Sequence, residues 1–265
     1  MFSPPSRVTR VFESKIDKFL RRYPPIGRLI TFLASSIEVA MLEVFRRIGK
    51  VINKPVHEYM FRSIYRGRWG GRVVPLNKNI DVETRFLPSQ EIIEILSRSS
   101  VAGIAECYCR HTYKNCDNPT KTCIHLSFGQ SLQQIPYKSE NLRKVSKEKI
   151  VELLEDCDSR GLVHSLIFFP NPEFYYVVCN CCPCCCVMLS RFLKSGSPQV
   201  IKSDFVAHTD QSKCENCGDC EQWCYFGARK LNDDKLSFNP ILCFGCGICV
   251  SKCPQKAISL VKKEE

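Results

Sequence analysis

The first fifty residues of this 265-residue chain carry apolar side chains at helical spacing. Between residues 7 and 23 they recur among arginines and lysines and predict a short amphipathic helix, which Pro24-Pro25 would end. A second helix is expected from Arg28 to Lys50. Its predicted apolar face comprises Ile30, Leu33, Ile37, Met41, Val44 and Ile48. Packing of that face on the chain's own core or on a partner is the favoured interpretation.

Short helical patterns and apolar runs of strand length alternate through the middle of the chain. One helix is predicted at Gln90–Ser97, with Ser89 as its N-cap. Another is predicted at Lys147–Asp158, capped by Ser146 and closed by Gly161. This mixture predicts a domain that contains both helices and a sheet.

The apolar runs of this region predict strands. Val101–Ala105 is one, and Leu162–Phe169 and Phe174–Val178 are two more that predict a hairpin. Two further pairings are expected near the C-terminus, of Lys230-Leu231 with Leu236-Ser237 and of Val206-Ala207 with Ile258–Val261.

Composition divides the chain into three parts, and together they predict an α+β fold. Residues 1–85 are interpreted as a basic helical arm, residues 86–195 as a cysteine-rich α+β domain and residues 200–265 as a smaller C-terminal domain. Ser195-Gly196-Ser197-Pro198 is expected to link the last two parts.

The formal charge of +11 is concentrated in the arm, where seventeen basic and seven acidic residues give a net of +10. The arm is therefore expected to dock an acidic partner, while peripheral contact with an anionic membrane stays open. The apolar run Leu29–Phe45 is only seventeen residues long and contains Glu38 and Glu43, which argues against a helix that spans a membrane. Arg62–Arg72 is interpreted as a solvated basic loop, and nucleic acid is the least favoured partner.

Nineteen cysteines are far more than a chain of this length ordinarily carries. A secreted disulfide scaffold is the first alternative, but the N-terminal residues show no apolar signal-peptide region. The cysteines also stand in dense groups and are odd in number, which favours metal ligands over disulfides. The expected compartment is a reducing, anaerobic cytoplasm, with membrane association left open through the arm.

The densest pattern lies near the C-terminus and occurs twice. The spacing C-x2-C-x2-C-x3-C describes both repeats, and Pro254 follows the last cysteine. Gly218 and Gly247 each follow the second cysteine of a repeat and supply the backbone freedom for a tight turn around a cluster. Zinc sites would use the same residue type, but they are usually built from two separated C-x-x-C pairs.

This doubled pattern resembles that of bacterial-type ferredoxins with two 4Fe-4S clusters, over residues 205–262. The resemblance implies that cluster I takes Cys214, Cys217, Cys220 and Cys253. It implies that cluster II takes Cys243, Cys246, Cys249 and Cys224. One departure is Tyr225, which stands after Cys224 where the family usually has proline, and which is expected to affect local rigidity and cluster potential.

Ten further cysteines are candidate ligands for iron–sulfur clusters or zinc in the central domain. They are Cys107, Cys109, Cys116, Cys123, Cys179, Cys181, Cys182, Cys184, Cys185 and Cys186. Cys107 and Cys109 are expected on an extended segment, where both thiols lie on one face and can reach one metal site. The six thiols from Cys179 onward cannot all reach one site, which favours two faces or a cluster with unusual ligation. Cys157, within a predicted helix, is interpreted as a core residue.

The region 90–190 also resembles uncharacterised cysteine-rich ferredoxin-like proteins of anaerobic archaea and bacteria. The shared features are Cys107-x-Cys109-Arg110, Cys116-Asp117-x-Pro119-x3-Cys123, Gly161-Leu162-Val163-His164 and the run of cysteines that begins at Cys179. Arg110 is expected to tune a nearby cluster, whereas His111 and His125 are left out of the candidate ligands.

Three functions follow from these patterns. The leading one is an electron-transfer protein, or a subunit of a redox complex, that carries two 4Fe-4S clusters and at least one further metal centre. It would pass electrons to or from a redox partner protein. The first alternative is an iron–sulfur reductase with a catalytic centre in the central domain. A redox-sensing nucleic-acid binder is weaker, because helix 147–158 is strongly acidic.

Overall fold

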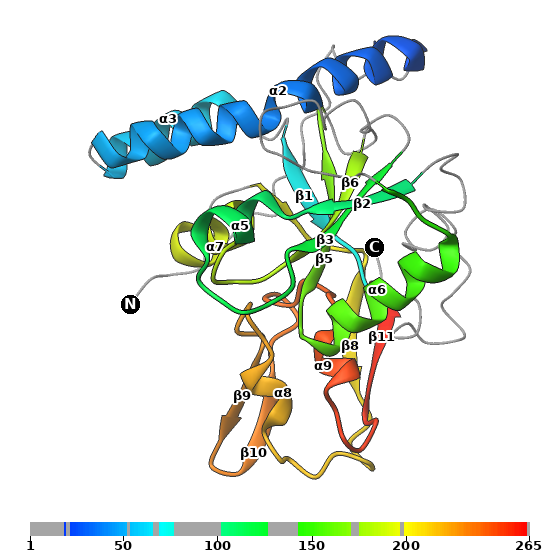
Figure 1. The fold of residues 1–265 in the computed structure, drawn as a ribbon. Helices are drawn as coiled ribbons and strands as arrows, with labels where there is room; N and C mark the ends of the chain where they lie inside the picture. Colours follow the sequence, from blue (N-terminus) through cyan, green and yellow to red (C-terminus); the bar gives the residue numbers. More distant parts are fainter. Residues whose placement is uncertain are drawn as a thin grey trace.

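A mixed sheet forms the centre of the computed structural model, which describes residues 19, 22–51, 54–65, 69–76, 102–126, 143–170, 175–196 and 199–263 (Figure 1). Its seven strands have the order β4-β2-β3-β6-β5-β1-β7. They are β1 (Gly70–Val73), β2 (Ala102–Glu106), β3 (Lys121–Leu126), β4 (Arg143–Lys144), β5 (Val163–Phe168), β6 (Tyr175–Cys181) and β7 (Val200–Ile201). All pairings are antiparallel except that of β1 with β7. The predicted mixture of helices and sheet is confirmed.

Strands β5 and β6 form the predicted hairpin at the centre of the sheet. Strand β6 continues three residues beyond the predicted end at Val178, and Cys181 pairs with Val163. Cys179 and Cys181 consequently belong to the strand itself, and because side chains alternate along a strand they lie on the same face of the sheet.

One face of the sheet is covered by α6 (Lys147–Ser159), which matches the predicted helix (Figure 1). Ser146 caps it by accepting a hydrogen bond from the Lys149 backbone N–H, and Gly161 follows its end with φ of +71°. Ile150 and Leu154 are buried against Ile124, Leu166 and Val178 of the sheet. Cys157 is fully buried, as predicted.

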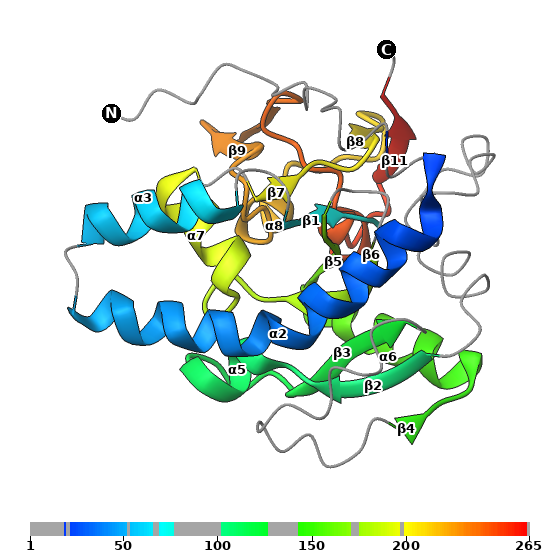
Figure 2. The same cartoon turned by 90° about the horizontal axis from the view of Figure 1, so that it is seen from above.

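The opposite face is covered by α7 (Val187–Ser195) and by α2 (Pro24–Val51), beside which α3 (Lys54–Tyr65) runs (Figure 2). Helix α2 contains the predicted helix Arg28–Lys50, whereas α3 was not predicted. Pro24, expected to end a helix, begins one, because the first turn of a helix tolerates proline. Of the helix predicted at residues 7–23, only Phe19, Arg22 and Tyr23 are among the described residues, and the helix predicted at Gln90–Ser97 lies outside them.

The apolar face predicted for α2 is only partly the buried one. Leu42 and Phe45 are buried, while Leu33, Ile37 and Val44 are each more than half exposed. Glu38 turns inward and accepts a hydrogen bond from Trp69 Nε1 at 2.7 Å. Burial raises the pKa of Glu38, although Tyr176 and Trp69 donate hydrogen bonds to it. A half-buried carboxyl group with hydrogen-bond partners therefore replaces apolar residues in this contact.

Two predicted boundaries differ from the observed sheet. The expected basic loop Arg62–Arg72 is wrong at both ends, because Arg62 belongs to α3 and Gly70–Arg72 to β1. Strand β1 therefore comes from the predicted arm, and β7 comes from beyond the predicted linker. The pairing of β1 with β7 joins segments that sequence composition had separated.

The C-terminal region packs on the lower end of the sheet in Figure 1. It contains β8 (Phe205–Thr209) paired with β11 (Ile258–Lys262), and β9 (Arg229–Asn232) paired with β10 (Lys235–Phe238), which confirms both predicted pairings. Two short helices, α8 (Asp219–Gln222) and α9 (Ile248–Ser251), follow the turns at Gly218 and Gly247. Ser251 Oγ of α9 donates a 2.5 Å hydrogen bond to Asp158 of α6. The Phe226 ring stacks on Phe244, which meets Phe192 of α7 edge-on.

No helix in the described part of the chain is long and apolar enough to cross a membrane. This agrees with the expectation for Leu29–Phe45, in which both glutamates, Glu38 and Glu43, accept hydrogen bonds. Glu43 accepts hydrogen bonds from Arg46, Arg47 and, at 2.9 Å, from the Tyr108 hydroxyl of the central domain.

Candidate metal centres

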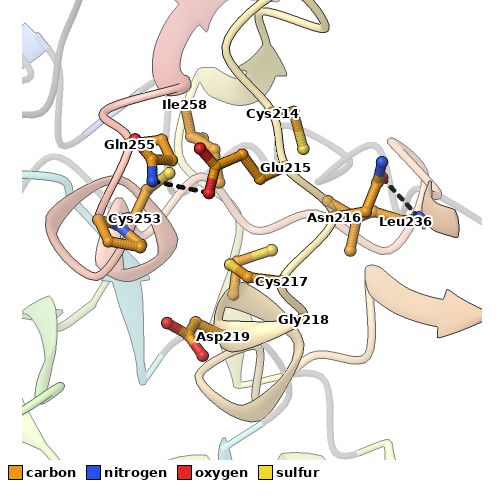
Figure 3. A pocket seen from close by; sticks show the side chains of 12 residues that line it. Cys214, Glu215, Asn216, Cys217, Gly218, Asp219, Leu236, Cys253, Gln255 and Ile258 are labelled. Carbon is orange, nitrogen blue, oxygen red and sulfur yellow. Dashed lines mark hydrogen bonds between the residues drawn. The ribbon is translucent and has the colours of Figure 1, made fainter. Parts of the chain in front are cut away.

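Two cavities in the C-terminal region are each lined by four cysteines. The first is lined by Cys214, Cys217, Cys220 and Cys253. The second is lined by Cys224, Cys243, Cys246 and Cys249. Each set therefore takes three cysteines from one repeat and the fourth from the other. Figure 3 shows Cys214, Cys217 and Cys253 around the first cavity, where Gln255 donates a hydrogen bond to Glu215.

The two repeats have the same local conformation. Gly218 and Gly247 both have φ of +81°, a conformation that L-residues rarely adopt, and each begins a short helix. The crossing cysteines are also matched, because Ala228 N–H donates to Cys224 Sγ at 3.2 Å and Ala257 N–H donates to Cys253 Sγ at 3.3 Å. Such N–H···S hydrogen bonds stabilise thiolates and raise the potential of a cluster that they hold.

A buried arginine lies between the two cavities. Arg229 is 1% exposed, and its positive charge acts on the thiols of Cys220 and Cys249, one from each set, in the direction that lowers their pKa. Its Nη1 also donates to Thr209 Oγ1 at 3.0 Å. Sequence reasoning missed this residue, because an arginine in a β-hairpin gives no sign that it will be buried between thiols.

Four of the ten central cysteines form a compact group. The Sγ atoms of Cys116, Cys182, Cys184 and Cys185 all lie within 4.8 Å of one another. Cys116 Sγ is 3.8 Å from that of Cys182 and 3.7 Å from that of Cys185. A tetrahedral ion with metal–sulfur bonds of about 2.3 Å holds its thiolates about 3.8 Å apart. The four-thiol group therefore has the dimensions of a site for a single zinc or iron ion.

Neighbouring amide groups donate hydrogen bonds to two thiols of this group, Cys116 and Cys185. Burial opposes ionisation of Cys116, but hydrogen bonds from Asn118 and the adjacent thiols lower its pKa to about 7. Asn115 N–H donates to Cys185 Sγ at 3.3 Å, and its side chain donates to the Cys184 carbonyl. Burial nevertheless raises the pKa of Cys185 to about 11, so a metal ion would have to displace its proton. Asn115 and Asn118 were not predicted, although both flank Cys116 in the sequence.

The other six central cysteines lie on the face of the sheet that α2 and α7 cover. They are Cys107, Cys109, Cys123, Cys179, Cys181 and Cys186, here called the six-thiol ring. The prediction that the cysteines from Cys179 onward serve two places agrees with this division. The expectation that Cys107–Cys109 is extended is wrong, because Cys107 is the N-cap of α5 (Tyr108–Tyr113) and Cys109 lies in its first turn.

Arg110 occupies the space between the four-thiol group and the six-thiol ring. It is 2% exposed, and its Nη1 donates to the Asn180 carbonyl at 2.7 Å and reaches Cys182 Sγ at 4.0 Å. The positive charge of Arg110 also interacts electrostatically with the thiols of Cys107 and Cys123 in the ring. Arg110 Nη2 also donates a hydrogen bond to Thr122 Oγ1, and His164 Nδ1 is hydrogen-bonded to Asn180 Oδ1. This position agrees with the expectation that Arg110 influences a nearby centre by charge.

Tyr225 packs with Cys246 of the second cavity against a core cluster of the central domain. The thiols of Cys246 and, in the four-thiol group, of Cys182 and Cys184 all act on the pKa of its phenol. Burial raises the pKa of Tyr225 to about 12, so the phenol is neutral at physiological pH. Its departure from the usual proline was noted in the sequence, but its position at this contact was not predicted.

Comparison with known proteins identifies the C-terminal region alone. Residues 213–258 match the 4Fe-4S dicluster domain family. No curated protein and no solved structure matches the chain. The ferredoxin resemblance is thereby confirmed for this region, which is an iron–sulfur electron-transfer domain with two 4Fe-4S clusters.

Proposed function

We propose that this chain is an electron-transfer protein or redox-complex subunit in which the dicluster domain exchanges electrons with a metal ion in the four-thiol group. The observation that carries this proposal is the packing of Tyr225, which joins Cys246 of the second cavity in a core cluster of the central domain and places its hydroxyl beside Gly161. The thiols of Cys182 and Cys184 in the four-thiol group also act on its phenol. A domain that only happened to be linked to a zinc-binding module would have no need for this contact.

The ligand sets of the two clusters form part of the proposal. Cluster I is assigned to Cys214, Cys217, Cys220 and Cys253, and cluster II to Cys224, Cys243, Cys246 and Cys249, because each set lines one cavity. Among the described residues, only the four-thiol group brings three or more cysteine sulfurs within 4.8 Å of one another. The wider spacing of both ferredoxin sets suits a cubane, in which each thiolate binds a different iron. When bound, each cluster takes up one electron at a time.

The order of the centres follows from exposure and contact. Cys217 of the first cavity is exposed, so electrons from a partner would enter at cluster I. Arg229 lines the second cavity, and its charge acts on a thiol of each ligand set. Tyr225 and Trp223, which both pack beside Gly161, then connect the second cavity to the central domain. The proposed path therefore runs from cluster I through cluster II to the four-thiol group.

Iron rather than zinc in the four-thiol group would make it the next step of this path, since zinc has no redox chemistry. Four thiolates complete a tetrahedral ion, which supports electron transfer more than substrate turnover at this group. The reductase alternative requires an iron with an open coordination position.

The helical arm is the proposed docking element for the partner. Leu29 and Tyr59 are more than half exposed, and basic residues occur throughout the arm. Such a surface suits an acidic redox partner, and the association should weaken as salt rises.

Replacement of Tyr225 by leucine tests the path. Rapid-mixing reduction of anaerobic protein should show slower reduction of the four-thiol iron by several-fold, while the dicluster absorbance is bleached at the normal rate. The phenylalanine variant should behave as the wild type, because the ring and not the hydroxyl fills the contact. Tyr59→Leu, on the exposed side of α3, is the matched control. Zinc in the four-thiol group, or equal rates in all variants, would contradict the proposal.

Replacement of Arg229 by methionine should lower the reduction potentials of both clusters. A buried positive charge favours the reduced cluster, which carries one more negative charge. At an effective dielectric constant of about 20 the lost interaction is about 1–2 kcal/mol, or about 40–90 mV for one electron. Redox titration followed by electron paramagnetic resonance measures the shift. Replacement of the exposed Lys230 by methionine should shift neither potential beyond a few millivolts.

A further inference from the structure

The six cysteines outside the four-thiol group form a closed ring of contacts. Cys107 contacts Cys109 and Cys123, and Cys109 contacts Cys186. Cys123 contacts Cys179, which in turn contacts Cys181. The Sγ atoms of Cys181 and Cys186 lie 3.3 Å apart and close the ring. Each thiol therefore has two thiol neighbours, drawn from β3, β6 and the starts of α5 and α7.

The sheet itself places half of the ring. Ile124 of β3 pairs with Val178 of β6, so Cys123 and Cys179, one residue further along each strand, are cross-strand neighbours. Cys181 lies two residues beyond Cys179, on the same face. The other three thiols come from the turns that precede or begin the helices above this face. Four elements converge, which a set of independent core cysteines would not require.

The ring is wider than a site for one metal ion. Although neighbouring thiols touch, no three of its six sulfurs lie within 4.8 Å of one another, whereas all four sulfurs of the four-thiol group do. A single tetrahedral ion needs every pair of its ligands about 3.8 Å apart. Six thiolates also exceed the four that such an ion accepts. The ring therefore offers more thiols, over a wider space, than one metal ion can use.

Two features bring positive charge to the six-thiol ring. Cys186 is the N-cap of α7, and the Leu189 backbone N–H donates to its sulfur at 3.4 Å. The positive end of a helix stabilises a thiolate at this position. Arg110, itself buried, supplies a positive charge beside Cys107 and Cys123. Uncompensated anions are costly in such a buried place, and Arg110 with the N-terminus of α7 would offset part of the negative charge that thiolate ligands bring.

We propose that the six-thiol ring binds a polynuclear iron centre bridged by inorganic sulfide, separate from the single ion of the four-thiol group. Inorganic sulfide bridges irons across a space that one ion cannot span. Arg110 lies between the two centres and contacts or faces sulfurs of both. The presence of this centre can be tested by the iron and sulfide content of the chain alone. The inference therefore does not depend on the proposed electron path.

Acid-labile sulfide in the intact, anaerobically purified chain is the first test. The dicluster domain accounts for about eight sulfides, and a single ion in the four-thiol group adds none. The expected result is clearly more than eight sulfides per chain, together with the matching iron. About eight sulfides in a chain whose ten central thiols are all accounted for as free thiols, disulfides or zinc ligands would overturn the proposal. The wild-type count needs no variant to fold.

The double variant Cys109→Ala with Cys179→Ala is the second test. These two residues lie opposite each other in the ring, and neither caps a helix. The sulfide content should return to about eight, while the spectra of the two dicluster centres and the ion of the four-thiol group persist. Cys157→Ala is the matched control, because Cys157 is equally buried but has no contact in the ring, and it should keep the full sulfide content. Excess sulfide that survives in the double variant would overturn the assignment to the ring.

Discussion

Replacement of Cys246 by alanine is expected to remove cluster II and to cut the central centres off from electrons that enter at cluster I. Cys246 lines the second cavity and is also the thiol of that cavity that faces Tyr225. Loss of one 4Fe-4S cluster lowers iron and sulfide by about four each per chain. The four-thiol iron should then be reduced slowly or not at all by electrons delivered to cluster I.

Cys217→Ala is the matched control for this prediction. Cys217 is an exposed member of the first set and makes no contact with the central domain. Its replacement should also lower iron by about four, but it leaves cluster II and Tyr225 in place. A small reductant that reaches cluster II directly should therefore still reduce the central iron. If the two variants impair reduction of the central iron equally, the proposed order of centres is wrong.

Replacement of Gly161 by alanine is expected to destabilise the chain more than the same replacement at Gly196. Both glycines have positive φ, but only Gly196 has open space around it. Gly161 follows α6 with φ of +71°. A Cβ atom there would lie 2.3 Å from a Trp223 ring carbon and 3.1 Å from the Tyr225 hydroxyl. The added methyl group must therefore displace the aromatic side chains through which the dicluster domain contacts the central domain.

Gly196→Ala separates backbone strain from this clash. Gly196 ends α7 with φ of +64°, and no atom lies within 4 Å of the position that a Cβ atom would take there. Both variants incur about 1–2 kcal/mol for an L-residue in the left-handed region. Gly161→Ala adds about 1–3 kcal/mol of overpacking. Its melting temperature should fall further by several degrees, at about 2–4 °C per kcal/mol for a chain of this size. Electron transfer to the central iron should also slow only in Gly161→Ala, and equal behaviour of the two variants would contradict a tight contact at Trp223.

The sequence predicted the local elements well wherever one physical rule dominated. The N-cap Ser146 and Gly161 marked both ends of α6, and the two apolar runs before Cys179 predicted the central hairpin. The same reasoning failed for Cys107–Cys109, where short-range alternation gave no sign that a helix begins directly after Cys107. It also mistook part of the exposed side of α2 for its buried face, because Glu38 turns toward Trp69 and Tyr176, hydrogen-bond partners that are distant in sequence.

The candidate sites divide in the same way. The doubled cysteine pattern was enough to identify the dicluster domain, because four ligands at short spacing must wrap around a cluster by local turns. The ten central cysteines come from three separate segments, and their spacing could not assign them to particular sites. Arg229 and Tyr225 also escaped prediction as contact residues, since their partners belong to other repeats or to another part of the chain.

The sequence by itself therefore determined the residue types, the dicluster repeat and the excess of thiols that a metal-rich protein needs. The tertiary structure alone decided that Cys116, Cys182, Cys184 and Cys185 meet in one compact group, that the other six form a ring, and that Arg110 lies between them. The physical reason is that repeat spacing is a property of local backbone turns. The grouping of the central thiols instead depends on strand register and on which face of the sheet each side chain takes.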